Sequence, residues 1–187
     1  MQSFQQFVES TKRLFVEVAK EEALPRGVVP QPQLFVLHQP SEQPMVATAV
    51  CRPYYPGQDA IAAIATLGNI ADAIGGTHLI VAWEESDLRT SMYGPGDHPK
   101  GLSLLLADYI HRAPNTLTWH PFTVEIDDAE RAHIHWEGTS VTQDPPLPDP
   151  IEQLLARWRA GLINDEQSAA HTVATARHDG YEIHLAQ

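Results

Sequence analysis

Cysteine, basic side chains and long apolar runs are all scarce in this sequence of 187 residues. The single cysteine, Cys51, excludes an intramolecular disulfide framework and any zinc module built from several cysteines. No stretch approaches the roughly 18 consecutive apolar residues of a membrane span. The N-terminal residues include Lys12, Arg13 and Glu17 in an amphipathic pattern, which is unlike a signal peptide. We therefore expect a cytoplasmic protein that does not engage a membrane.

Basic residues number 12 against 24 acidic residues, which gives a formal net charge of −12. Nucleic acids are bound mainly by Lys and Arg side chains that neutralise phosphates, so this balance argues against a nucleic-acid partner. An acidic surface keeps a protein soluble and is compatible with a protein partner. We expect the partner to be another protein or a second copy of this chain in a homo-oligomer.

The motifs of common catalytic and nucleotide-binding sites are also missing. The sequence has no Walker-type phosphate loop, no Gly-x-Gly-x-x-Gly, no Gly-x-Ser-x-Gly and no His-Glu-x-x-His. The loop Gly94–Gly96 contains a proline where a phosphate cradle needs free N–H groups. No cofactor is implied, and the sequence leaves open whether the protein is an enzyme.

Helical spacing of apolar residues predicts four helices: residues 4–23, Gln58–Ile74, Asp149–Ala160 and Asn164–Gly180. Ser3 and Gln6 have the spacing of a capping box at the start of the first helix. The central helix is rich in alanine, carries one apolar stripe and is followed by Gly75, which favours a left-handed cap. The last two helices are expected to form a helical hairpin.

Short apolar runs bounded by turn residues predict six strands: Gln33–His38, Met45–Cys51, Thr77–Trp83, Leu102–Ile110, Leu117–Ile126 and Ala132–Glu137. Most connections are too short for a crossover helix, which favours antiparallel pairing. Apolar parity switches at Pro121, which predicts a bulge or a corner. The expected fold class is α+β: a mainly antiparallel sheet of about six strands packed by the N-terminal and central helices, with a C-terminal helical hairpin.

A proline-rich run predicts a division of the chain. Gln143–Pro150 has the composition of a stiff linker. Residues 1–142 are thus expected to form the α+β core domain, and residues 143–187 the linker and the helical hairpin. The apolar side chains expected to be exposed on this hairpin are Leu154, Leu155, Trp158, Leu162 and Ile163.

Two resemblances accompany this layout. The run Gly161–Ile163 followed by Asp165–Gln167 resembles short C-terminal helical modules of bacterial proteins, and that resemblance implies oligomerisation. The strand-and-helix layout from Gln33 to Glu137 is similar to α+β proteins of bacteria and their phages. The second resemblance implies no substrate.

Histidines on two predicted neighbouring strands form the first candidate site. His133 and His135 alternate with apolar residues and therefore face the same way. A register that pairs Val124 with Ile134 sets Glu125 opposite His133. The candidate metal ligands are His120, Glu125, His133 and His135. The alternative is a solvated sheet face, on which Glu–His pairs stabilise little.

Acidic residues after a buried strand form the second candidate site, a position where ligand-contacting groups often lie. Its candidate catalytic residues are Glu84, Asp87, Asp108 and His111. Alternation places Asp108 on the face of Leu104 and Leu106, so its carboxylate could point into the core with a raised pKa. The alternative is that the buried part of the strand ends near Leu106 and that Asp108 is in water.

Tyr and Arg residues between prolines form a candidate interface, because Tyr, Trp and Arg dominate interface hot spots. The candidate interface residues are Arg52, Tyr54, Tyr55, Tyr93 and Trp158. The alternative is that Tyr54 and Tyr55 cover the end of the sheet. The neighbouring Cys51 lacks an assignable base and is interpreted as a core residue.

Three functions remain. The first is a protein-binding or regulatory module that self-associates through helices near either end of the chain. The second is a small-molecule or metal-dependent enzyme that uses one of the two polar clusters. The third is an accessory protein of a phage or mobile element. Missing catalytic motifs and acidic charge favour the first function.

Overall fold

The structure is a computed structural model that describes residues 3–110, 113–129, 131–163 and 165–186. Within this part of the chain, eight strands form one sheet: β1 (Gln33–Leu37), β2 (Met45–Val50), β3 (His78–Glu84), β4 (Gly101–Asp108), β5 (Thr116–Ile126), β6 (Ala132–Trp136), β7 (Ser140–Gln143) and β8 (Glu182–Leu185). Their order is β6-β5-β4-β3-β1-β2-β8, with β7 also paired to β5, and every pair is antiparallel. The predicted α+β class with an antiparallel sheet is confirmed.

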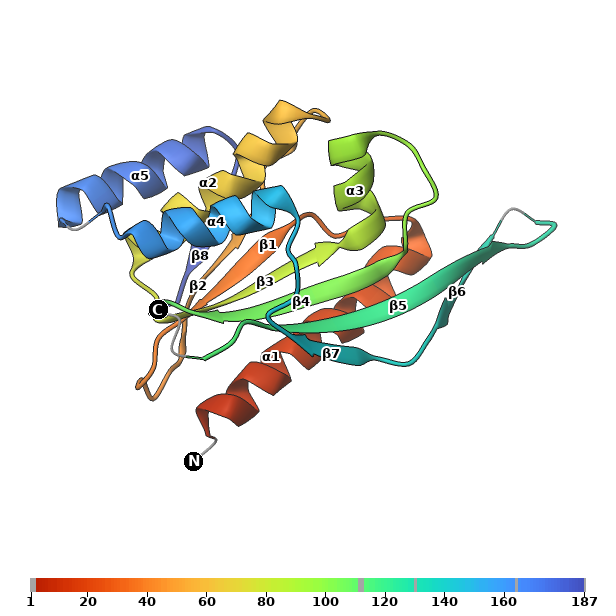
Figure 1. Cartoon of the computed structure of the whole chain (residues 1–187), viewed down its shortest axis with the longest axis horizontal. Helices are drawn as coiled ribbons and strands as arrows, with labels where there is room; N and C mark the ends of the chain where they lie inside the picture. Colours follow the sequence, from red (N-terminus) through yellow and green to blue (C-terminus); the bar gives the residue numbers. More distant parts are fainter. Residues whose placement is uncertain (1–2, 111–112, 130, 164, 187) are drawn as a thin grey trace.

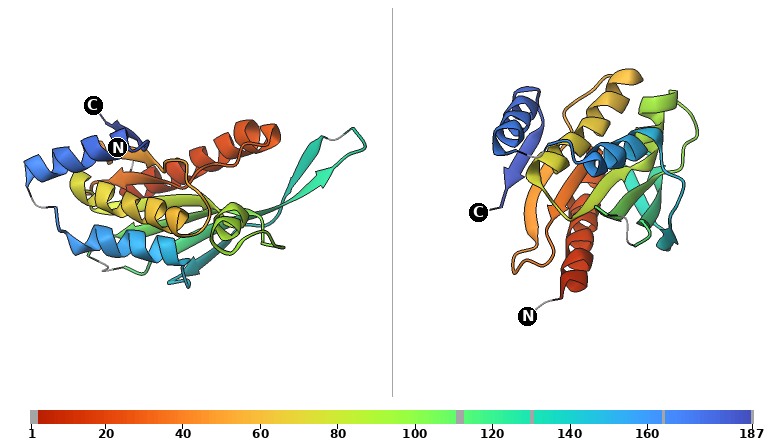
Figure 2. Two further views of the ribbon diagram at one scale, coloured as in Figure 1. Left: turned by 90° about the horizontal axis from the view of Figure 1, so that it is seen from above. Right: turned by 60° about the vertical axis from the view of Figure 1, so that its left-hand side comes forward.

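The described residues form five α-helices: α1 (Phe4–Val18), α2 (Gln58–Ile74), α3 (Glu85–Tyr93), α4 (Asp149–Ala160) and α5 (Glu166–His178). α1 continues as a π-helical turn (Ala19–Ala23) and a 3-10 turn (Leu24–Arg26). The predicted capping box is present, because the Gln6 N–H donates to Ser3 Oγ at 3.2 Å and the Ser3 N–H donates to Gln6 Oε1 at 2.8 Å. α2, α4 and α5 lie on one side of the sheet and α1 on the other (Figures 1 and 2). None of the described helices combines the length and the apolar character that crossing a membrane requires.

The face under α2 holds a cluster of fully buried side chains. Leu67 of α2 and Trp158 of α4 belong to this cluster together with Leu79 of β3. α4 approaches α2 at Gly68, where a β-carbon would lie only 2.1 Å from the carbonyl oxygen of Leu154. The missing side chain of Gly68 therefore lets α4 pack closely against α2. Leu154 and Trp158 are both 0% exposed, so the expectation that they face outward for a partner is wrong.

The chain returns to the sheet after α5. β8 adds an edge strand that pairs with β2, with Ala49 opposite Ile183. The Tyr181 hydroxyl donates to the Ala63 carbonyl oxygen at 2.8 Å and ties this segment to α2. The expectation that Ala132–Glu137 is the last strand is therefore wrong. Residues on both sides of position 142 contribute to one hydrophobic cluster.

The opposite face carries a smaller cluster under α1. Val8 and Val16 of α1 pack over Ile80 of β3 and Leu102 of β4. A helix with its side chains is about 10 Å wide, and strands lie about 4.8 Å apart. One helix therefore covers about two strands, and α1 leaves the β1–β2 part of this face open.

β5 is a long strand that changes partners along its length. Its register with β4 runs from Thr116 to Pro121 and its register with β6 from Phe122 to Ile126, without a shift in either. Leu117 packs toward α2 and Phe122 toward α1, as regular alternation requires. Of the predicted bulge or corner at Pro121, the bulge is wrong, because the side chains keep their alternation and the face of the strand that is covered changes there. The β5–β6 end extends beyond the helices (Figures 1 and 2).

Candidate interaction surfaces

The predicted pairing of the histidine strands is present. Val124 lies opposite Ile134 and Glu125 opposite His133. Both His133 and His135 are exposed, and each contacts a carboxylate: His133 Nε2 lies 3.0 Å from Asp127 Oδ2, and His135 Nε2 lies 3.3 Å from Glu125 Oε2. This arrangement has the open, solvated character of the alternative interpretation.

His120 does not join this patch. It differs from Glu125 by five positions on one regular strand, so its side chain lies on the opposite face of β5. There, His120 Nδ1 lies 3.0 Å from Thr139 Oγ1. Burial lowers the pKa of His120, and the positive charges of Lys20 and Lys12 lower it further. Within the described residues, no three His, Cys, Asp or Glu side chains are placed to hold a metal ion.

The second predicted cluster is also divided. Glu84 lies opposite Leu102 and Asp108 opposite His78, so the two carboxylates stand at opposite ends of the β3–β4 pair. His111 lies outside the described residues. Asp108 is half-buried and accepts from the Ala113 N–H at 3.2 Å.

Glu84 instead caps α3. Its carboxylate accepts from the Asp87 N–H at 2.6 Å and from the Gly101 N–H at 3.0 Å. Burial raises the pKa of Glu84, because the charged form is separated from water. The acidic residues after β3 thus begin a helix that the sequence analysis did not predict.

Cys51 is a core residue, as interpreted from the sequence. The thiol is buried, and burial raises its pKa to about 12. At neutral pH this thiol is protonated and is therefore a poor nucleophile.

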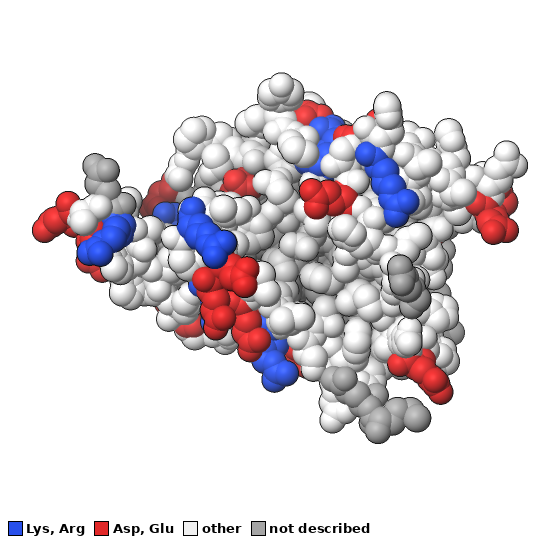
Figure 3. Space-filling model, turned by 180° about the vertical axis from the view of Figure 1, so that it is seen from behind, with Lys and Arg blue, Asp and Glu red and all other residues white. Residues whose placement is uncertain are grey.

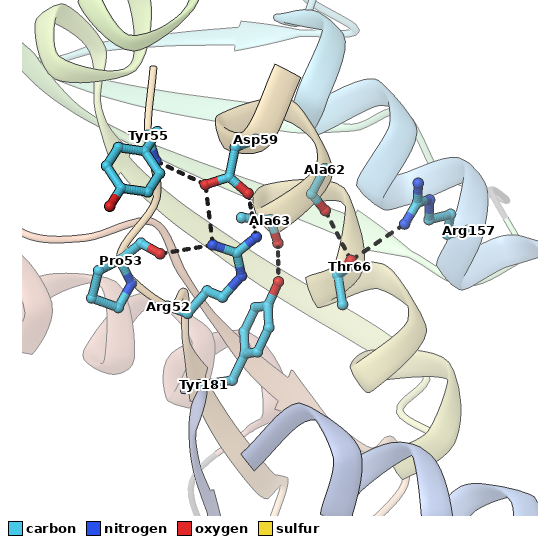
Figure 4. A network of polar contacts seen from close by, with 9 residues as sticks. All are labelled: Arg52, Pro53, Tyr55, Asp59, Ala62, Ala63, Thr66, Arg157 and Tyr181. Carbon is cyan, nitrogen blue, oxygen red and sulfur yellow. Dashed lines mark hydrogen bonds and ion pairs between the residues drawn. The ribbon is translucent and has the colours of Figure 1, made fainter. Parts of the chain in front are cut away.

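The candidate interface residue Arg52 is engaged within the chain (Figure 4). Its guanidinium binds both carboxylate oxygens of Asp59 and donates to the Pro53 carbonyl oxygen at 2.8 Å. Asp59 also accepts from the Tyr55 N–H at 2.8 Å. The pairing with Arg52 lowers the pKa of Asp59. This network fixes the loop after β2 to the first turn of α2.

Tyr55 and Tyr93 are the exposed members of the predicted interface. They are 82% and 66% exposed, and a hydrogen bond of 2.7 Å from the Gly57 N–H to the Ser91 carbonyl oxygen holds their two segments together. Tyr54 is half-buried against the core. The fifth predicted residue, Trp158, packs edge-on to Tyr109 inside the protein.

A groove beside α1 is a surface that the sequence analysis missed. It has a volume of about 700 Å³ and lies between α1 and the strands β1 and β2. Its apolar lining residues are Phe7, Leu14, Phe15, Val18, Ala19, Ala23, Pro30, Phe35 and Met45. Seen from behind (Figure 3), the molecule has a hollow near its centre that is lined by uncharged side chains, and charged side chains lie around its rim. The sequence carries one signal for this groove. The apolar residues of the first helix form a stripe that is wider than the part of the helix that packs on the sheet.

A second hollow lies on the other face of the sheet, between α3, β5 and the proline-rich segment. Its volume is about 470 Å³, and its walls include Trp83 and Trp119. The Glu85–Arg89 ion pair lies at its edge, with Arg89 Nε 2.7 Å from Glu85 Oε1.

The α1 groove and the Trp83–Trp119 pocket differ in chemistry. None of the described residues that line the groove is charged, whereas the pocket combines aromatic walls with an ion pair. Both are built from residues that are far apart in the sequence. The chain matches no protein-family model, no curated protein and no solved structure.

Proposed function

We propose that this protein is a self-associating protein-binding module and that two copies pair through the α1 groove. The observation that carries the proposal is an apolar groove with an exposed apolar ridge along one wall. Leu14 and Val18 stand four positions apart on one side of α1 and are 61% and 47% exposed. A two-fold pairing needs one self-complementary surface, and a ridge next to a groove meets that need.

Charge supports a second copy as the occupant. The chain carries a net charge of −12, so two copies repel each other across most of their surface. The N-terminal helical segment, residues 3–26, carries no net charge, because its four acidic and four basic residues cancel: Glu9, Glu17, Glu21, Glu22, Lys12, Arg13, Lys20 and Arg26. When two copies meet through this segment, neither surface carries a net charge, so the contact adds no net repulsion.

The mass of the protein in solution tests the proposal. Light scattering on a size-exclusion column should give twice 20.7 kDa for the wild type. Leu14→Asp places a charge on the ridge, and burying an unpaired carboxylate is strongly unfavourable. This variant should elute with the mass of one chain and keep the circular dichroism spectrum of the wild type.

Leu162→Asp is the matched control. Leu162 is 80% exposed after α4, at the other end of the chain, and the same change there should leave the mass of two chains. A wild type with the mass of one chain at 100 µM would contradict self-association. Dissociation by Leu162→Asp and not by Leu14→Asp would instead move the interface to the C-terminal helices.

A further inference from the structure

The Trp83–Trp119 pocket has the size and lining of a small-molecule site. Its volume of about 470 Å³ lies within the roughly 300–1,000 Å³ that such sites occupy. The wall is aromatic and aliphatic, and its apolar and aromatic members are Trp83, Met92, Tyr93, Pro99, Leu117, Trp119, Pro145, Pro146, Leu147 and Pro148. Flat ligands pack well against such walls, because aromatic rings stack or meet edge to face.

One wall depends on a glycine. Trp119 lies across Gly101 of the neighbouring strand β4, and a β-carbon on Gly101 would be 2.2 Å from Trp119 Nε1. Any other residue at position 101 would displace the indole ring. The absence of a side chain at this position thus allows Trp119 to lie on the sheet and line the pocket.

The polar groups of the pocket are arranged around Glu85. This carboxylate is buried and accepts from Trp83 Nε1 at 2.7 Å, from Arg89 Nε at 2.7 Å and from Ser103 Oγ at 3.3 Å. Its oxygens are therefore occupied by groups of the protein. Among the described residues that line the pocket, Glu85 is the one with a carboxylate, and a ligand that enters meets it already hydrogen-bonded.

This contact fixes the position of Arg89 but leaves some of its hydrogen-bond donors available. Glu85 holds the guanidinium through Nε, and the two terminal nitrogens have no hydrogen-bond partner among the residues that the structure describes. The side chain is 42% exposed at the pocket edge. A guanidinium held by one edge presents the other as a pair of parallel donors, the geometry that binds a carboxylate with two hydrogen bonds.

We infer that this pocket binds a small aromatic carboxylate. Its carboxylate is bound by the terminal nitrogens of Arg89, and its ring packs against Trp83 and Trp119. Glu85 is a positioning residue, because it orients Arg89 without touching the ligand. The negative charge of distant residues is largely screened beyond about 8 Å at physiological salt, whereas the terminal donors of Arg89 act on the ligand at hydrogen-bond distance.

The test uses the intact protein and two probes that differ in one group, 2-naphthoate and its neutral amide 2-naphthamide. Calorimetric titration at pH 7.5 should show saturable binding of the acid and binding at least about tenfold weaker for the amide, since a charged hydrogen-bond pair is lost. Arg89→Gln should weaken the binding of the acid by about tenfold or more and leave the affinity for the amide unchanged. Arg13→Gln, at an arginine that is 71% exposed on α1, should change neither.

Three results would overturn the inference. The first is no saturable heat with up to about 5 mM acid, and the second is equal affinity for acid and amide. Both concern the wild type and hold even where Arg89→Gln fails to fold. The third is loss of binding in Leu14→Asp, which would place the probe in the α1 groove. The first two results do not depend on the mass of the protein, so the pocket and the proposed self-association fail separately.

Discussion

The two faces of the sheet are covered to very different degrees. The path from β6 to β8 contains seven strands, which span roughly 30 Å at a spacing of about 4.8 Å. Helices about 10 Å wide must lie three abreast to cover that width. α2, α4 and α5 do so on one face, whereas α1 is the one described helix that covers the other (Figure 2).

This difference explains where the α1 groove lies. Under the three helices, Ile64, Leu67 and Trp158 are fully buried within the chain. Beside α1, Phe35 and Met45 of the sheet are only half-buried, and Leu14 is exposed. The same strands supply both faces, so the number of helices, and not the composition of the sheet, leaves one face open.

The largest expected effect comes from truncating the covered face. Trp158→Ala should lower the free energy of unfolding by about 3–5 kcal/mol, because it leaves a large cavity between α4 and the core. Leu14→Ala, on the open face, should change the free energy of unfolding of the single chain by about 0.5 kcal/mol or less. Denaturant unfolding of both variants, at protein concentrations low enough for the two copies to separate, measures the difference. A loss of similar size in Leu14→Ala under these conditions would show that this side chain is buried within its own chain, and the two faces would no longer differ.

A smaller effect is expected where the covering helices touch. Gly68→Ala adds a β-carbon 2.1 Å from the Leu154 carbonyl oxygen, and overpacking of this kind costs about 1–3 kcal/mol. In an open helix the same change would stabilise by up to about 1 kcal/mol. Net destabilisation in thermal unfolding is therefore the sign of close packing between α2 and α4.

Gly138→Ala is the matched control for Gly68→Ala. A β-carbon at Gly138 meets none of the described residues within 4 Å, so this variant should be no less stable than the wild type. A more stable Gly68→Ala variant would contradict the close approach, because α4 would then move away from α2 without cost. The covered face would in that case be less tightly packed than the buried side chains indicate.

Much of the sheet was predictable because its strands are apolar and alternate clearly. The pairing of Val124 with Ile134 followed from matching apolar residues across one hairpin. β7 and β8 were missed, because four-residue edge strands carry little periodicity: every residue of β7 is exposed, and only Ile183 of β8 is buried. α3 was missed because it has few apolar residues and depends on the cap from Glu84.

The candidate sites were harder to predict for two physical reasons. An amphipathic helix that contains Trp158 has the same pattern whether its apolar side packs on α2 or on a partner, so burial within the chain could not be read from spacing. The prediction that Glu84 and Asp108 form one cluster was wrong, because two consecutive antiparallel strands have their C-terminal residues at opposite ends of the pair. The two hollows require residues from several elements, and no local pattern brings those residues together.

The smallest expected effect concerns acid and is confined to the open face. His78 lies 4.7 Å from Phe4 of α1, measured between ring centroids, and His120 lies near Lys12 and Lys20. Burial lowers the pKa of both histidines, and the two lysines lower that of His120 further. The unfolded chain therefore binds protons at these positions near pH 6.5, where the folded chain does not.

The free energy of unfolding should accordingly fall as the pH drops from about 6.5 through the lowered pKa values, since the unfolded state takes up more protons over this interval. The double variant His78→Gln and His120→Gln should lose less stability than the wild type between pH 7 and pH 5, measured by urea unfolding at each pH. His171→Gln, at an exposed position on α5, should follow the wild type. If the stability of the double variant falls with pH as that of the wild type does, these two histidines titrate alike in the folded and unfolded chain. The helix α1 would then shield its face of the sheet from water less than the contacts of Phe4 and Lys12 imply.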